Sequence, residues 1–178
     1  AMISANIQSE RLDEILSHEI QTGTTKLDHK GYDIVFSHVG FSYDRKESVL
    51  KDVTFTAKQG EVTALIGPSG GGKTTVSRLA ARFWDIEKGK ITVGGMDISK
   101  IDPETLMSLY SIVFQDVTLF NNTIMENIRI GRQDATDEEV IAAAKLAHCD
   151  EFARKLPDGW QTMIGENGSE LSGGERQR

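Results

Sequence analysis

The sequence has little of several residue types, and each scarcity excludes a class of protein. Cys149 is the only cysteine among 178 residues, which excludes a disulfide framework within the chain. Its neighbour His148 lacks the second Cys/His pair that a zinc site needs. No run approaches the about 18 apolar residues of a membrane-spanning helix. The formal net charge of −7 argues against a broad basic face that neutralises phosphates, so we expect no nucleic acid partner.

The remaining composition is that of an ordinary globular chain, with 38% hydrophobic and 26% charged residues. The first segment has an amphipathic helical pattern, with Leu12, Ile15, Leu16 and Ile20 on one face. Residues 21–31 are polar, rich in Gly and Thr, and lack a period, as in a linker or an exposed loop. We therefore predict that residues 1–30 form a linker helix and loop, and that the domain proper begins near residue 31.

The pattern after residue 31 alternates strands and helices and predicts an α/β fold. Residues 33–43 and 49–57 read as antiparallel strands joined by a hairpin. The run EVTALIG at 61–67 is continuously apolar, which favours a strand buried on both faces. Residues 74–84 have helical spacing, 91–95 and 111–115 read as short strands, and helices dominate from 123 to 156. Thr136 followed by three acidic residues marks the start of one of these helices.

The residues GPSGGGKT, from Gly67 to Thr74, fit the phosphate-loop pattern G-x-x-x-x-G-K-[ST] between a predicted strand and a predicted helix. Glycines let the backbone approach phosphate oxygens, and the amide groups and the positive end of the helix attract the anion. Lys73 is expected to reach the β- and γ-phosphates, and the Thr74 hydroxyl to complete the coordination of Mg²⁺. The predicted phosphate-binding residues are Gly67, Ser69, Gly70, Gly71, Gly72, Lys73, Thr74 and Thr75.

Two other readings of the same loop are weaker. The residues Gly67 to Gly71 also fit G-x-S-x-G, the nucleophile elbow of α/β-hydrolases, with Ser69 as nucleophile. Its nearest acid and histidine, Asp137 and His148, lie within or beside one predicted helix, and the elbow has no use for the Lys-Thr pair. A GTPase would need N-K-x-D after the loop, and the sequence has no such tetrapeptide. A small-molecule kinase stays open at this point.

The residues LSGGE, from Leu171 to Glu175, together with the phosphate loop, resemble the ATP-binding cassette (ABC) family, whose signature motif is this pentapeptide. The Ser172 side chain can cap the following helix, which leaves the amides of Gly173 and Gly174 free at its positive end. In the family this second anion site closes over an ATP held by a partner subunit in a head-to-tail dimer. The resemblance therefore implies that these three residues contact the partner's ATP.

The resemblance extends over nearly the whole chain. Tyr43 matches the aromatic residue on which the adenine ring stacks, although a strand aromatic in the core is the alternative. Gln115 matches the residue that touches Mg²⁺ or the attacking water. The resemblance thus implies ATP and Mg²⁺ as cofactors, Lys73 and Gln115 as catalytic residues, and Thr74 and Gln115 as metal ligands. The runs 119–131 and 162–175 resemble the exporter branch, with Asn167 where an Arg is usual.

The fold implied by the resemblance is a P-loop NTPase core with an antiparallel β subdomain and an α-helical subdomain. Residues 31–178 would be the nucleotide-binding domain, with the β subdomain and P-loop core at 31–117 and the helical subdomain at 118–178. In the family the Walker B strand, the general base and the switch histidine follow the signature, after Arg178 here. Because the general base would come after Arg178, we expect this chain to turn over ATP poorly. The Walker B strand lies beside the strand before the phosphate loop in the family, so we also expect low stability or self-association.

The parent protein is expected to hydrolyse ATP to drive export of a substrate. Its partners would be a second nucleotide-binding domain and a transmembrane domain fused upstream, which places this chain on the cytoplasmic side of the cell membrane. Two alternatives stay open: a soluble ABC-type ATPase that acts on DNA or in repair, and a nucleotide-binding module that never hydrolyses.

Overall fold

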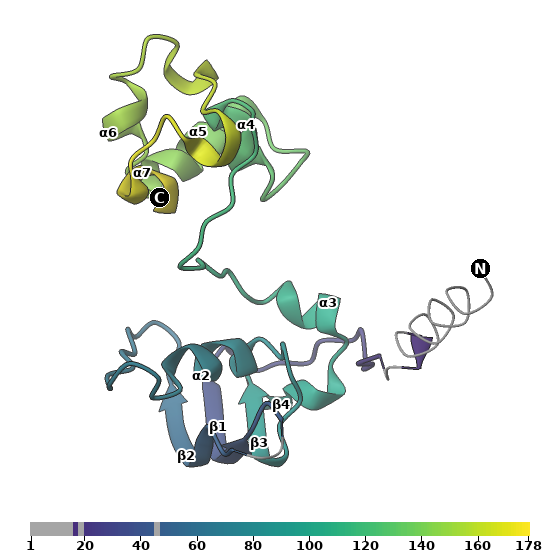
Figure 1. Cartoon of the computed structure of the whole chain (residues 1–178). Helices are drawn as coiled ribbons and strands as arrows, with labels where there is room; N and C mark the ends of the chain where they lie inside the picture. The colour runs from purple at the N-terminus through teal and green to yellow at the C-terminus, as the bar shows by residue number, and fades with distance from the viewer. Residues whose placement is uncertain (1–15, 18–19, 45–46) are drawn as a thin grey trace, which may run out of the picture. The chain divides into compact units, whose positions relative to one another are not determined.

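The computed structural model describes residues 16–17, 20–44 and 47–178 (Figure 1). The chain divides into a first unit, residues 1–111, and a second unit, residues 112–178, and each is described by itself. Most of the amphipathic segment predicted before residue 20 lies outside the described residues.

The first unit contains a four-stranded antiparallel sheet with the strand order β2-β1-β3-β4. Its strands are β1 (Ile34–Phe41), β2 (Leu50–Ala57), β3 (Lys88–Val93) and β4 (Met96–Asp97). Phe36 of β1 stands opposite Phe55 on one side and Ile91 on the other. The predicted pairing of 33–43 with 49–57 is therefore confirmed, and the predicted strand at 91–95 is the end of β3.

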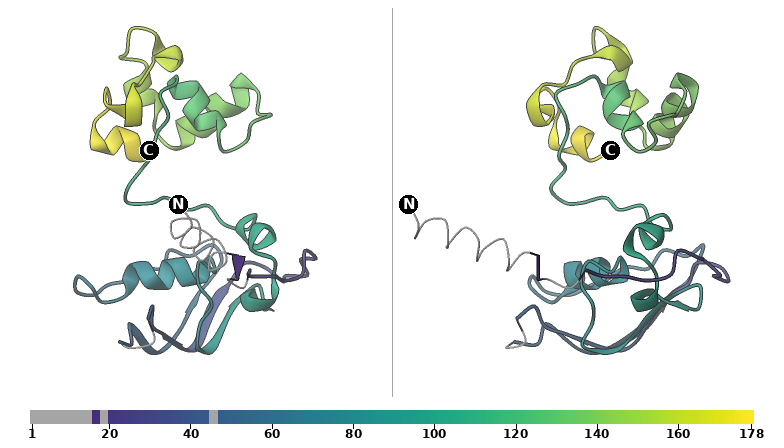
Figure 2. Two further views of the ribbon diagram at one scale, coloured as in Figure 1. Left: turned by 45° about the vertical axis from the view of Figure 1, so that its right-hand side comes forward. Right: turned by 90° about the vertical axis from the view of Figure 1, so that its right-hand side faces the viewer.

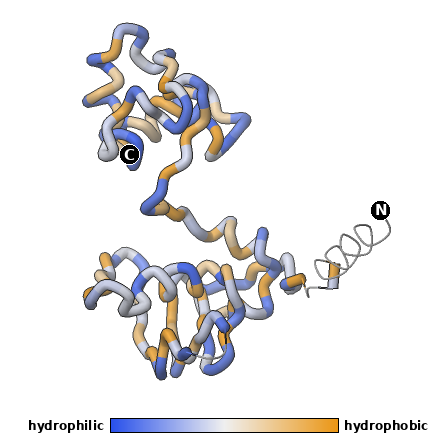
Figure 3. Tube along the Cα trace, viewed as in Figure 1, coloured by the Kyte–Doolittle hydropathy of each residue, from blue (hydrophilic) through white to orange (hydrophobic). Residues whose placement is uncertain are grey.

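Helix α2 (Lys73–Ala80) contributes Val76 and Leu79 to the same hydrophobic core as β1 and β3. Figure 2 shows this helix lying along one face of the sheet. The chain then passes through the 3₁₀ turn η1 (Ile98–Lys100) and the short helix α3 (Pro103–Met107), which add Ile98 and Leu106 to this core. Apolar residues recur along the strands and helices of this unit (Figure 3), and their burial supplies its main stabilisation.

Two predicted strands are wrong. Residues 61–67 have no regular structure, and the side chains of Val62 and Ile66 are 99% and 95% exposed. Residues 111–115 are also irregular, and Val113 is 70% exposed. An apolar run forms a strand only when a neighbouring strand takes its backbone hydrogen bonds, and no described strand pairs with either segment.

The second unit is helical. Its elements are α4 (Ile124–Arg129), α5 (Asp137–Leu146), α6 (Asp150–Ala153), η2 (Gly159–Gln161), η3 (Glu166–Gly168) and α7 (Gly173–Gln177). The core joins Ile124, Phe152 and Ile164 around the buried Cys149. Thr136 caps α5 through a capping box with Glu139, as the sequence predicts.

The buried helix and the exposed 61–67 segment predict opposite responses to substitution. Leu79→Ala should lower the free energy of unfolding by about 2–5 kcal/mol, because Leu79 is fully buried. The double variant Val62→Ser and Ile66→Ser should stay within about 0.5 kcal/mol of the unchanged chain, because both side chains face solvent. Urea unfolding measures both values. A double variant as costly as Leu79→Ala would show that residues 61–67 are buried.

Candidate functional site

The phosphate loop is a largely exposed turn whose last two residues, Lys73 and Thr74, are the first two of α2. Gly70 and Gly72 have φ values of 77° and 81°, which lie in the left-handed region that favours glycine. Gly72 is also the N-cap of α2, and a Cβ atom there would lie 2.6 Å from Leu50 Cδ2. Glycine is therefore required at this position both by the backbone conformation and by the close approach of β2.

The Lys73 side chain forms hydrogen bonds with the backbone of the loop to which it belongs. Its ammonium donates hydrogen bonds to the carbonyl oxygens of Gly67 and Pro68, at 2.9 and 2.7 Å, and the Gly71 amide donates to the Pro68 carbonyl at 3.1 Å. An anion is a stronger acceptor for an ammonium than a neutral carbonyl. The loop thus places one cation and the positive end of an eight-residue helix beside an exposed turn, which is a donor set that fits phosphate.

Tyr43 lies against the first turn of this helix. Its hydroxyl is 2.9 Å from Thr75 Oγ1, and Thr75 itself is buried. The Tyr43 ring meets Trp84 edge to face, with centroids 5.1 Å apart, and Phe41 at 4.9 Å. Because half of the surface of Tyr43 is exposed, this residue offers an aromatic side chain beside the phosphate loop and is not enclosed in the core.

Gln115 and the signature residues belong to the second unit. Gln115 lies in an exposed bend after the irregular 111–114 segment. Ser172 caps α7 through a capping box: its Oγ accepts from the Glu175 amide at 3.3 Å, and Glu175 Oε2 accepts from the Ser172 amide at 2.8 Å. Gly173 and Gly174 are exposed at the start of that helix. The predicted cap is confirmed, and the glycine backbones face solvent.

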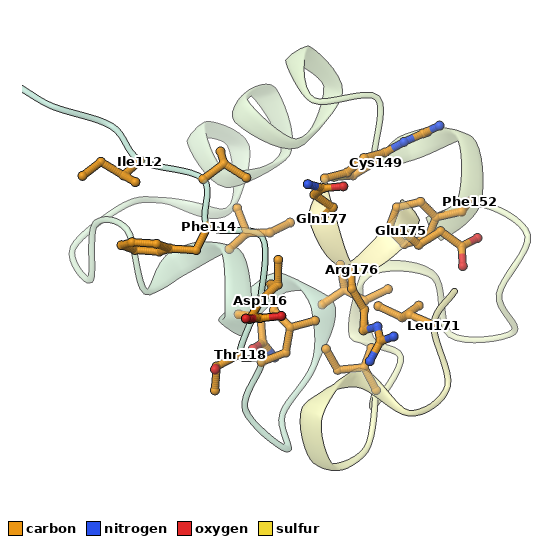
Figure 4. Close-up of a pocket in the computed structure, with 18 residues that line it drawn as sticks. Ile112, Phe114, Asp116, Thr118, Cys149, Phe152, Leu171, Glu175, Arg176 and Gln177 are labelled. Atoms are coloured by element: carbon orange, nitrogen blue, oxygen red, sulfur yellow. The ribbon is translucent and has the colours of Figure 1, made fainter. Parts of the chain in front are cut away.

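A groove of about 460 Å³ separates two segments of the second unit that carry these residues. Figure 4 shows Ile112, Phe114 and Asp116 from one segment and Leu171 and Glu175 from the other. The sequence gives no indication of this groove, because its walls combine residues 112–119 with residues of α4, of α6 and of the end of the chain.

Asn167 holds the loop before the signature to the segment that follows Gln115. Its backbone is left-handed, with φ 56°, and its Oδ1 accepts a hydrogen bond from the Leu119 amide at 3.3 Å. Asparagine tolerates this conformation better than most residues. The departure from the family pattern noted in the sequence therefore has a local structural role.

Sequence reasoning missed two residues of the first unit. Trp84 contacts the Tyr43 ring, and Arg82, two positions before it in the chain, is buried. The sequence Arg-Phe-Trp at the end of a predicted helix does not indicate which of these side chains is buried or which residues they contact.

The comparisons with known proteins decide the family. The sequence model of the ABC transporter family matches residues 50–178. The chain belongs to the ABC transporter family. A solved bacterial Atm1-family ABC exporter with ATP bound superposes with a TM-score of 0.87 at 36% identity, over 98% of this chain and 32% of that one. The α/β fold class with an antiparallel sheet is thereby confirmed.

Two relatives of the chain are named as a flippase and a transporter. The ATP-dependent lipid A-core flippase of Legionella pneumophila (strain Paris) is 49% identical over 146 residues, which is 82% of this chain and 25% of the flippase. The mitochondrial iron-sulfur clusters transporter ATM1 of Saccharomyces cerevisiae is 46% identical over 147 residues, 83% of this chain and 21% of the transporter. The chain thus spans a quarter or less of these two relatives, and their names favour the exporter interpretation over the soluble alternative. None of the helices in the described residues is long and apolar enough to span a membrane.

The capping box between Ser172 and Glu175 predicts a lowered pKa for the Glu175 carboxyl. The pKa of Glu175 is lowered from its ordinary value, chiefly by the hydrogen bond with the Ser172 side chain. Ser172→Ala should therefore raise the pKa of Glu175 toward its ordinary value, and NMR titration of the Glu175 carboxyl measures it. Because the folded-state pKa is lowered, the stabilisation is present at neutral pH and is lost as pH falls through that pKa. An unchanged pKa in the variant would contradict the contribution of the cap.

Proposed function

We propose that this chain is the nucleotide-binding domain of an ABC exporter, in which ATP binding and hydrolysis drive transport of a substrate across a membrane. One observation carries the proposal: a phosphate loop with the required left-handed glycines lies beside a half-exposed tyrosine, in a chain that also holds the capped LSGGE motif. The family membership and the exporter relatives support it.

In this proposal the base and the triphosphate of ATP lie on adjacent parts of the first unit. The Tyr43 ring stacks on adenine. The amides of the loop, at Gly67, Ser69, Gly70, Gly71 and Gly72, surround the phosphates, and Lys73 exchanges its two carbonyl acceptors for phosphate oxygens. Thr75 holds Tyr43 through its hydroxyl and leaves its amide at the helix end for phosphate.

Mg²⁺ would be held by the Thr74 hydroxyl and by Gln115, and when bound it neutralises charge that develops on the phosphates. Thr74 is exposed at the start of α2, and Gln115 is exposed in its bend, so both oxygens are accessible to a cation. Gln115 also orients the attacking water.

The second unit serves a second nucleotide-binding domain. Ser172, Gly173 and Gly174 contact the ATP held by that partner in a head-to-tail dimer, since their backbone groups are exposed at a helix start. We assign residues 1–30 to a linker from a transmembrane domain, 31–117 to the β subdomain and P-loop core, and 118–178 to the helical subdomain. The chain then acts on the cytoplasmic side of the membrane.

Titration calorimetry with Mg-ATP tests nucleotide binding. Lys73→Ala should abolish the binding seen with the unchanged chain, because it removes the only side-chain cation found in the phosphate loop. Lys51→Ala is the matched control: Lys51 is an exposed lysine of β2 outside the loop, and its loss should leave the affinity unchanged. Equal binding by both variants, or no binding by the unchanged chain, would contradict the proposed site.

Turnover tests the assignment of the chemistry. The resemblance places the general base after the signature motif, so the purified 178-residue chain should hydrolyse ATP well below about 1 per second, the low end for phosphoryl-transfer enzymes. Release of inorganic phosphate measures the rate. Hydrolysis near that value, lost in Lys73→Ala, would mean that a base within these residues suffices.

A further inference from the structure

Arg82 is the one buried charged residue among those that the structure describes, with 6% of its surface exposed. It follows Ala81, the C-cap of helix α2, and has a φ of 55°. Its amide donates to the Leu79 carbonyl at 3.0 Å, and the Phe83 amide donates to the Arg78 carbonyl at 3.0 Å. This is the Schellman arrangement that ends a helix, and its left-handed position is normally occupied by glycine. An arginine there indicates that its side chain is needed.

The Arg82 guanidinium joins three separate segments. Nε donates to Asp85 Oδ1 at 2.8 Å, and Nη1 donates to the carbonyl oxygens of Ile101 at 2.5 Å and Thr22 at 3.1 Å. Asp85 follows the helix, Ile101 follows η1, and Thr22 lies 60 residues before Arg82. A buried cation requires such acceptors, because an unpaired charge away from water is costly.

Thr22 belongs to the linker segment, defined here as residues 20–33, which contacts residues 100–102 through one isolated β-bridge. The Thr24 amide donates to the Lys100 carbonyl at 2.8 Å, and the Asp102 amide donates to the Thr24 carbonyl at 3.0 Å. These bonds form a parallel bridge between Thr24 and Ile101. Contact is so close at Gly23 that a Cβ atom there would lie 2.2 Å from the Ile101 carbonyl carbon.

We infer that Arg82 is a positioning residue that fastens the linker segment to the end of the phosphate-loop helix. The inference rests on the proposed function only in assigning the linker segment to the connection with a transmembrane domain. Helix α2 begins at Lys73 and ends at Ala80, with Ala81 as its C-cap before Arg82, so the phosphate loop and the contact with the linker segment lie at opposite ends of one short helix. A nucleotide that orders the loop will then also stabilise the hydrogen bond from Arg82 to the Thr22 carbonyl.

Hydrogen exchange of the whole chain tests the fastening, with Arg82→Gly as the variant. Glycine suits the left-handed φ and preserves the helix end, while the guanidinium is lost. The amides of Thr24 and Asp102 should exchange about tenfold faster, as expected for a lost hydrogen bond to a charged group. Amides of the β1–β2 pair, whose hydrogen bonds do not involve Arg82, are the internal control. Unchanged exchange at Thr24 and Asp102 would overturn the inference, because a purely capping role predicts that result.

Two further variants keep the test decisive. Arg82→Lys retains the charge and one donor group, so it should restore part of the protection that Arg82→Gly loses. Gly23→Ala keeps Arg82 but places a Cβ atom against the backbone of Ile101, which displaces the linker segment. The amides of Thr24 and Asp102 should then exchange faster in this variant too. Protection unaffected by Gly23→Ala would show that the linker segment does not lie against residues 100–102, and would also overturn the inference.

Nucleotide separates this inference from the proposed function. With saturating Mg-ATP the unchanged chain should show further slowing of exchange at Thr24 and Asp102. Arg82→Gly should still bind Mg-ATP in calorimetry, without that slowing and with an affinity weaker by the factor by which the slowing is lost, because coupling between two sites is reciprocal. Equal slowing in both proteins would overturn a transmitting role for Arg82. Absence of Mg-ATP binding by the unchanged chain would contradict the proposed function, and the nucleotide-free comparison would still decide whether Arg82 fastens the linker segment.

Discussion

The packing of helix α2 against the antiparallel sheet is the contact on which the first unit depends. Val76 and Leu79 bury the inner face of the helix in the core formed by β1 and β3. That burial fixes the direction of the helix, and the direction fixes what lies at each end. The phosphate loop precedes the first turn, Thr75 in that turn holds the Tyr43 hydroxyl, and Arg82 follows the last turn. The positions of Tyr43, of the phosphate loop and of the contact between Arg82 and Thr22 are therefore set by one apolar interface.

Local patterns in the sequence were sufficient where the structure is local. The hairpin of β1 and β2, helix α2 and the caps at Thr136 and Ser172 all follow from residues within a few positions of one another. The segment 61–67 shows the limit of this reasoning. Its apolar run satisfies the requirement for a buried strand, yet burial also needs a neighbouring strand, and periodicity carries no information about whether one is present.

The candidate site divides in the same way. The phosphate loop and the signature could be recognised because glycine, lysine and a capping serine are each required at a fixed spacing. The contacts that position these motifs could not be found. Tyr43 reaches Thr75 across 32 positions, and Arg82 reaches Thr22 across 60. Such pairs become neighbours only after the sheet has formed, so no local pattern records them.

The buried Cys149 gives the chain a practical property. It is the only thiol in the sequence, it lies inside the core of the second unit, and burial raises its pKa. A thiol reacts as the thiolate, so this cysteine will be slow toward alkylating reagents while the chain is folded. A second cysteine introduced on the surface can then be labelled selectively without removing Cys149. Labelling at Cys149 itself will report local opening of the helical unit.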